Sequence, residues 1–336
     1  MSQQTPVPGV KEAVDRGPSP KPRKSSWRER HSVVGPWVRG RNAVIGIPYV
    51  WLLVFFLLPF LIVLKISMSE VEGVRFKDVF TFTDGLMQLT LKFSNYVFIT
   101  QDDLYFKTYI SSVKYAAVTT AFCLAIGYPF AYFMARAKAT LQPTLLMLVM
   151  LPFWTSFLLR VYAWKGLLSE GGWVANLLNA LGIDNLLLAM GLIPALGKYM
   201  NSPFSLVLGM VYTYLPFMIL PLYGNLAKMD LRLLEAAADL GATPFTAFWK
   251  VTVPMSKAGI IAGSMLVFIP CVGEFVIPEL LGGPQTLMIG RVLWDEFFSN
   301  NDWPMASTVA VVMVLLILVP LAIFNHYQAR AQETRR

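Results

Sequence analysis

The chain has 336 residues, of which 56% are hydrophobic and 14% charged, and its formal net charge is +8. A soluble domain carries about 25% charged residues, whereas several apolar runs here reach the roughly 20 residues that cross a bilayer. The composition excludes a soluble globular protein and indicates an integral membrane protein. The two cysteines, Cys123 and Cys271, both lie in apolar segments and offer neither a disulfide framework nor a metal-ligand spacing.

In chain order, a tail over residues 1–42 comes first. It is rich in Pro, Ser, Lys and Arg and poor in aliphatic residues, so it is predicted to be disordered. Six apolar stretches follow, and each predicts a helix because a lone strand leaves its backbone unpaired in lipid. The spans are expected at 43–66, 108–134, 143–166, 203–226, 257–281 and 305–328. The sequence thus predicts an all-α, six-helix membrane domain over 43–328 and a short tail over 329–336.

Lys and Arg accumulate on the cytoplasmic side of a membrane protein, and their distribution here predicts the orientation. Eighteen lie in the segments on one side, which are 1–42, 135–142, 227–257 and 330–336. Six lie in the opposite loops, which are 69–107, 167–202 and 282–304. Both termini are therefore predicted to be cytoplasmic. The outer loops carry eleven acidic residues, which would concentrate a cation there, and the net charge gives no reason to expect a nucleic-acid partner.

The cytoplasmic loop 227–256 contains the stretch "EAAADLGATPFTAFWKVTVP", from Glu235 to Pro254. Leucines and Ala237 recur there at helical spacing, which predicts a first short helix with one apolar stripe. Gly241 is expected to end this helix in the left-handed conformation. Thr243 and Pro244 suit the N-cap and first turn of a second helix, which Pro254 is expected to end. The result is a helix–turn–helix on the membrane surface, with apolar residues available to a partner.

This loop resembles the cytoplasmic signature of ATP-binding-cassette (ABC) importer permeases. The matching residues are Glu235, Ala236, Ala237, Gly241, Val251, Val253 and Pro254, with two valines where the family often has Ile and Leu. The resemblance implies the type I importer architecture and a coupling helix that docks on an ATPase subunit. The residues expected to carry this coupling are Glu235, Ala236, Ala237, Asp239, Gly241 and Pro254. The alternative is an amphipathic loop that lies on lipid headgroups.

Three further stretches, 151–168, 257–284 and 289–320, resemble the permeases of spermidine/putrescine importers, the putrescine-importer branch above all. The resemblance covers roughly 43–328 and implies a multi-pass protein of the bacterial inner membrane. It also implies a second related permease, two ATP-binding subunits and a periplasmic polyamine-binding protein as partners. The chain has no phosphate-binding G-x-x-x-x-G-K-[ST] loop. It is therefore expected to be no enzyme and to hold no cofactor, with ATP and Mg²⁺ on the partner subunits.

A polyamine path needs carboxylates and aromatic faces at membrane depth to replace the water of the cation. Glu274 is the leading candidate, because an ionisable residue inside a span is a functional hypothesis by default. The other candidates for the path are Trp154, Tyr162, Trp164, Tyr214, Trp294, Asp295 and Glu296. Three alternatives stay open. The aromatics are also typical of an interfacial belt, the two loop acids of a solvated face, and Glu274 of a structural ion pair with Arg160.

Other classes of membrane protein fit less well. A secondary transporter would need repeated spans and an ion relay, and a channel would need a pore-lining ring. A membrane enzyme would need a cluster of nucleophile, base or metal ligands, yet the only histidines are His31 and His326, in flanking segments. An importer of another cationic or small organic solute remains the serious alternative, because the cytoplasmic loop concerns the ATPase and not the cargo.

Overall fold

The structure is a computed structural model that describes residues 41–69, 71–72, 75–76, 80–83, 86–89 and 93–333, with side chains described for 44–69 and 93–322. It divides into two compact units, Met1–Pro59 and Phe60–Arg336, and each is described by itself. The predicted disorder of the tail over 1–42 falls outside the described residues, apart from the last two. Part of the predicted C-terminal tail is helical, because the last helix continues to Glu333.

The first predicted span is a continuous apolar helix. It consists of α1 (Arg41–Leu52), a π-helical turn η3 (Leu53–Leu57) and α2 (Leu58–Ser67). The stretch Val44–Ser67 is 24 residues long with a mean hydropathy of 2.6. A helix of that length rises about 36 Å, enough to cross the hydrocarbon core of a bilayer.

Three further long helices form the second, fourth and sixth predicted spans. They are α4 (Asp103–Arg136), α9 (Pro203–Leu226) and α16 (Trp303–Glu333). Helices α4 and α9 pack against each other and against α13 (Lys257–Val272), around the main apolar core. On α13, a Cβ at Gly263 would lie 2.8 Å from the Met218 sulfur on α9. Small residues at such positions let membrane helices approach closely.

The third and fifth predicted spans are each broken into shorter helices. The third consists of α5 (Gln142–Met150) with a 3-10 turn η4 (Leu151–Trp154), then α6 (Phe157–Leu168) after a bend of 87°. The fifth consists of α13 and a short α14 (Val276–Leu281). Pro152 and Pro270 lie near these breaks, and proline removes a helical hydrogen bond. Within the described residues, four helices are long and apolar enough to span a membrane. There are up to six if each of two bent pairs is one span, the pairs being Gln142–Trp154 with Phe157–Leu168 and Pro244–Met255 with Lys257–Val272.

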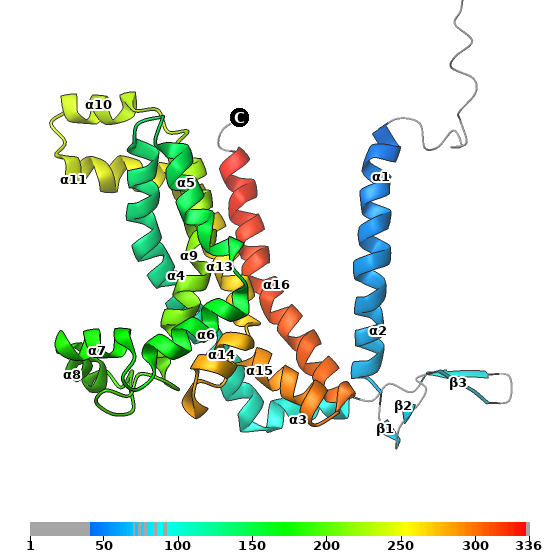
Figure 1. The fold of residues 1–336 in the computed structure, drawn as a ribbon. Helices are drawn as coiled ribbons and strands as arrows, with labels where there is room; N and C mark the ends of the chain where they lie inside the picture. The colour runs from blue at the N-terminus through cyan, green and yellow to red at the C-terminus, as the bar shows by residue number, and fades with distance from the viewer. Residues whose placement is uncertain are drawn as a thin grey trace, which may run out of the picture. The chain divides into compact units, whose positions relative to one another are not determined.

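The segments between the spans gather at opposite ends of the second unit. Figure 1 shows α10 (Arg232–Asp239) and α11 (Pro244–Ala247) at one end of α4, α5 and α9. The segments at the other end are α3 (Ser94–Gln101), α7 (Trp173–Ala180), α8 (Ile183–Ala189), α14 and α15 (Ile289–Trp294). This agrees with the predicted division into two sides. The sequence did not predict two short antiparallel strand pairs, β1–β2 (Val71–Glu72, Arg75–Phe76) and β3–β4 (Phe80–Thr83, Leu86–Leu89).

Which end faces the cytoplasm stays a prediction, and cysteine labelling tests it. In a background without Cys123 and Cys271, which are both buried, single cysteines would be placed at exposed positions. A membrane-impermeant maleimide applied from outside is expected to label Asn179→Cys and Ser299→Cys. It should not label Thr140→Cys until the membrane is permeabilised, because the Lys/Arg bias puts that loop inside. Labelling of Thr140→Cys in intact cells would reverse the topology.

Candidate functional site

The break in the fifth span is organised around the carboxylate of Glu274. This side chain is 8% exposed. Its Oε1 accepts hydrogen bonds from the backbone N–H groups of Phe275 (3.1 Å) and Val276 (3.0 Å), at the start of α14. The first N–H groups of a helix have no partner within the helix and carry partial positive charge. Glu274 therefore caps α14 with a negative charge.

The second carboxylate oxygen joins this break to the fourth span. The hydroxyl of Tyr214, on α9, donates to Glu274 Oε2 over 2.5 Å. Tyr214 is itself buried, at 8% exposed. Hydrogen bonds to an ionised acceptor are short and strong, so this contact fixes α9 against the end of α13. The sequence named both residues as candidates but gave no sign of their bond.

Arg160 does not pair with Glu274, which corrects the structural alternative for that carboxylate. Among the ion pairs of the described residues, none joins the two. The Arg160 guanidinium donates from Nη1 to the carbonyl oxygen of Pro152 over 2.6 Å and lies 5.8 Å from the ring centroid of Phe153. A cation suits the carbonyl end of a helix. Each broken span therefore carries a charge that caps its own backbone.

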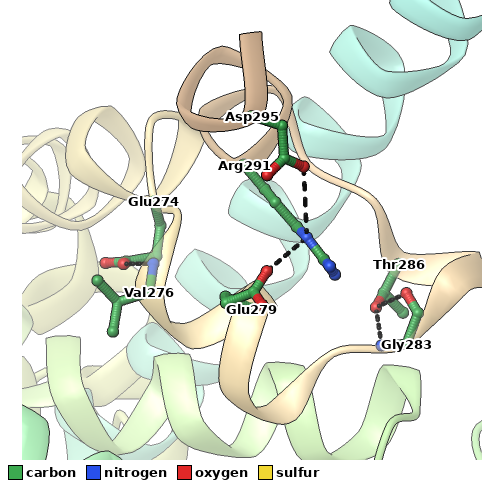
Figure 2. A network of polar contacts seen from close by, with 7 residues as sticks. All are labelled: Glu274, Val276, Glu279, Gly283, Thr286, Arg291 and Asp295. Carbon is green, nitrogen blue, oxygen red and sulfur yellow. Dashed lines mark hydrogen bonds and ion pairs between the residues drawn. The ribbon is translucent and has the colours of Figure 1, made fainter. Parts of the chain in front are cut away.

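A second polar cluster holds the segment that follows α14 (Figure 2). The Nε of Arg291, on α15, lies 2.6 Å from Glu279 Oε2 on α14 and 3.9 Å from Asp295 Oδ2. The neighbouring residue Gly290 sits so close to the break that an added Cβ would clash with the Gly273 carbonyl oxygen. Helix α15 is therefore seated directly on the break. Sequence reasoning missed Arg291 and Glu279. The i,i+4 spacing of Arg291 and Asp295 was the available signal, and nothing local pointed to Glu279.

The predicted outer-loop candidates take part in the folded structure. The Trp294 ring stacks on Phe275, with centroids 4.6 Å apart and an interplanar angle of 10°. Glu296 accepts a hydrogen bond from the Tyr105 hydroxyl, on α4, over 2.8 Å. Asp295 lies in the cluster of Arg291. A contact from α4 thus holds Glu296, which a purely solvated loop face does not describe. Asp295 is 46% exposed and lies 3.9 Å from Arg291, four residues earlier, so the solvated-face alternative stays open for it.

The three aromatic candidates of the third span lie apart from Glu274. Trp154, at the end of η4, is 72% exposed, and Tyr162, on α6, is 53% exposed. Trp164 packs edge-on against Tyr212, with centroids 5.4 Å apart. No contact of the described residues joins any of the three to the carboxylate. Their part in a cargo path stays a prediction, as does that of the other candidates.

The first half of the cytoplasmic loop folds as predicted. Helix α10 ends at Asp239, and Gly241 takes a φ of +80°. The N–H of Gly241 donates to the Ala238 carbonyl over 2.8 Å, and the N–H of Ala242 donates to the Ala237 carbonyl over 2.9 Å. These two bonds form a Schellman motif. The predicted left-handed glycine at the end of the helix is confirmed.

The second helix of the cytoplasmic loop begins as predicted and extends slightly further than predicted. Thr243 caps α11 by accepting from the N–H of Thr246 over 3.3 Å, and Pro244 is the first residue of that helix, as predicted. The helix then continues through a π-helical turn η5 (Phe248–Thr252) and α12 (Val253–Met255). The helix ends at Met255, one residue after Pro254. The chain then bends by 65° before Lys257, so the break predicted before the fifth span is present next to Pro254.

The loop presents an apolar surface while one side chain fastens it to the span beneath. Leu240 is 89% exposed and Phe245 is 73% exposed. Phe248, by contrast, packs edge-on against Tyr128 and Tyr132 of α4, with centroids 5.5 and 5.7 Å away. The predicted coupling residues on this surface are exposed, except for the partly covered Ala237; they are Glu235, Ala236, Asp239, Gly241 and Pro254. The loop therefore carries an exposed apolar surface and is joined to α4 through Phe248.

Comparisons with known proteins identify relatives over most of the chain. The family model described as "Binding-protein-dependent transport system inner membrane component" matches residues 124–333. The spermidine/putrescine transport system permease protein PotB of Haemophilus influenzae is 38% identical over 296 residues, 88% of this chain and 96% of that protein. The protein of the same name from Escherichia coli is 37% identical over 274 residues, 80% of this chain and 92% of that protein. The predicted putrescine-importer branch is not distinguished from these relatives.

A solved structure supports the architecture. The chain is similar to one in the crystal structure of a bacterial alginate ABC transporter in complex with an alginate pentasaccharide-bound periplasmic protein, with a TM-score of 0.58 and 15% identity. The likeness covers 86% of this chain and 94% of that one. At this identity it establishes the fold and carries no statement about cargo. The predicted ABC-importer permease architecture is confirmed.

Proposed function

We propose that this chain, which belongs to the family of binding-protein-dependent transport-system inner-membrane components, is the permease of a polyamine importer. The alignment with a spermidine/putrescine permease over 88% of the chain carries this proposal. As a permease component of the inner membrane, the chain is not itself an enzyme. Its partners in the proposed complex are a second permease, two ATP-hydrolysing subunits and a periplasmic protein that delivers the polyamine.

Coupling to ATP hydrolysis is assigned to the surface of α10 and α11. The apolar side chains of Leu240 and Phe245 are largely exposed, Phe245 touching only the edge of the exposed Trp249 ring among the ring contacts of the described residues, and Glu235 adds a charge on the same helix pair. Exposed apolar surface rimmed by polar residues is typical of protein interfaces. Because Phe248 fastens the loop to α4, movement of a docked ATPase subunit would be passed to that span.

The cargo path is assigned to the side of the fold where the fifth span is broken. Glu274 supplies a negative charge at membrane depth. Asp295 and Glu296 extend the acidic surface outward, and Trp294 offers a ring face for an ammonium. The same path takes in Tyr214. The exposed aromatics Trp154 and Tyr162, with the partly buried Trp164, are assigned to the part that a second permease would complete. The Glu274 oxygens are occupied by donors of the chain itself, so direct contact with cargo requires an exchange of those bonds.

Uptake by cells with and without the chain tests the proposed function. A strain that lacks the chain is expected to lose saturable uptake of radiolabelled putrescine or spermidine, and to regain it when the intact chain is supplied. An amino acid serves as the control solute, with uptake expected to be equal in both strains. Loss of amino-acid uptake with unchanged polyamine uptake would favour the alternative, an importer of another small organic solute.

A further inference from the structure

The two broken spans are connected through the fourth span by a continuous set of side-chain contacts. At the break in the third span, Arg160 covers the ring of Phe153. Phe153 packs edge-on against Phe217 of α9, with centroids 5.2 Å apart and an interplanar angle of 86°. Phe217 contacts Tyr214 one turn away, with centroids 6.1 Å apart. Tyr214 then donates its hydroxyl to Glu274 at the break in the fifth span.

At each end of this set of contacts, a charged side chain forms hydrogen bonds with the backbone where a span is broken. Arg160 donates to the Pro152 carbonyl, just before the 87° bend. Glu274 accepts from the first N–H groups of α14. The Pro152 carbonyl also accepts from the N–H and the hydroxyl of Thr155, so loss of Arg160 removes one of three donors that hold this bend. Loss of Glu274 takes the acceptor from the N–H groups of Phe275 and Val276, which must then find other partners. A change at one break therefore alters the position of an aromatic ring that reaches the other.

We propose that Arg160 and Glu274 are positioning residues at the two ends of a relay, consisting of Arg160, Phe153, Phe217, Tyr214 and Glu274, that couples the break in the third span to the break in the fifth. Neither end needs to touch cargo for the relay to act. Arg160 and Glu274 do not form an ion pair with each other. Each caps a different helix end, and the packed aromatic rings lie between the two residues. Coupling between sites is carried by such contiguous packing when the linked elements have discrete arrangements.

The buried thiol of Cys271 can report a change at the break in the fifth span, which is the far end of the relay from Arg160. Cys271 lies on the last turn of α13 and is 0% exposed. The labelling rate of Cys271 by N-ethylmaleimide would be measured on this chain in membranes that carry the full complex. Cys123→Ala removes the only other thiol of the chain. In this background Arg160→Gln is expected to raise the Cys271 labelling rate about twofold or more. This factor corresponds to the smallest interaction energies found between residues of one contact network. Arg160→Lys keeps a cation able to reach the carbonyl, and is expected to restore the original rate.

A double-substitution cycle separates a relay from two independent effects. Tyr214→Phe removes only the hydroxyl that binds Glu274, and should also raise the labelling rate. Combined with Arg160→Gln it is expected to add little, because both changes interrupt the same connection. Tyr212→Phe is the matched control. Its ring contacts Trp164 and lies outside the relay, so it should leave the rate unchanged. Phe153→Leu breaks the aromatic link while keeping the cation and is expected to resemble Arg160→Gln.

Two results would overturn the relay. One is an unchanged Cys271 labelling rate in both Arg160→Gln and Phe153→Leu. The other is a rate in the double variant that equals the product of the two single effects, which marks independent sites. The labelling needs no cargo. A negative labelling result would therefore contradict the relay and would not bear on the proposed polyamine transport. A negative uptake result would contradict the proposed transport and would not bear on the relay.

Discussion

Glu274→Gln is expected to lower polyamine uptake about tenfold or more while the amount of assembled complex stays unchanged, since a hydrogen bond to a charged group contributes about 1.5–3 kcal/mol. The substitution removes the charge but keeps an oxygen that can accept from Phe275 and Val276, as Glu274 Oε1 does. The cap on α14 therefore survives and the attraction for an ammonium does not. Initial uptake rates and the amount of purified complex would be measured in the same membranes.

Two companion variants make this result specific. Glu274→Ala also removes the cap and leaves the partly buried N–H groups of Phe275 and Val276 without this acceptor, at up to about 1–3 kcal/mol each, so it should lower assembly as well as uptake. Glu170→Gln is the control, because this acid is exposed and only loosely paired with Lys198, at 3.8 Å. It is expected to leave both quantities unchanged. Full assembly together with full uptake in Glu274→Gln would remove this carboxylate from the cargo path.

Gly241→Val and Glu235→Arg are expected to release the ATPase subunit from the permease while membrane insertion stays normal. Gly241 has a φ of +80°, where a side chain costs about 1–2 kcal/mol per residue. A Cβ at this position meets no atom within 4 Å, so the cost falls on the backbone of the turn and not on packing. Glu235→Arg reverses an exposed charge on the same surface. Co-purification of the ATPase subunit and transport rate would be measured for both.

The control for the glycine substitution is Gly224→Val on α9. A Cβ there also meets open space, but the residue lies within a regular helix, so attachment should be retained. If the ATPase subunit stays bound at normal levels in both Gly241→Val and Glu235→Arg, and transport is normal, α10 and α11 do not form the coupling surface.

The sequence by itself determined those features that depend on neighbours along the chain. Apolar runs of about 20 residues located the spans, because lipid imposes that length on any helix that crosses it. The turn at Gly241 and the cap at Thr243 were predictable for a similar reason, since a Schellman motif and an N-cap are built from residues within one or two turns. The pattern around Glu235 also carried the family resemblance that the comparisons confirmed.

Only the tertiary structure decided how the charges within the membrane are satisfied. The sequence required a partner for Glu274 and suggested Arg160, but the partner is Tyr214 on another span, together with the backbone at the start of α14. Arg160 caps Pro152 instead, and Arg291 finds Glu279 across a bend. A buried charge must be compensated wherever it lies. Which donor or acceptor comes within about 3 Å of it is set by how the helices break and pack, and local sequence does not encode that geometry.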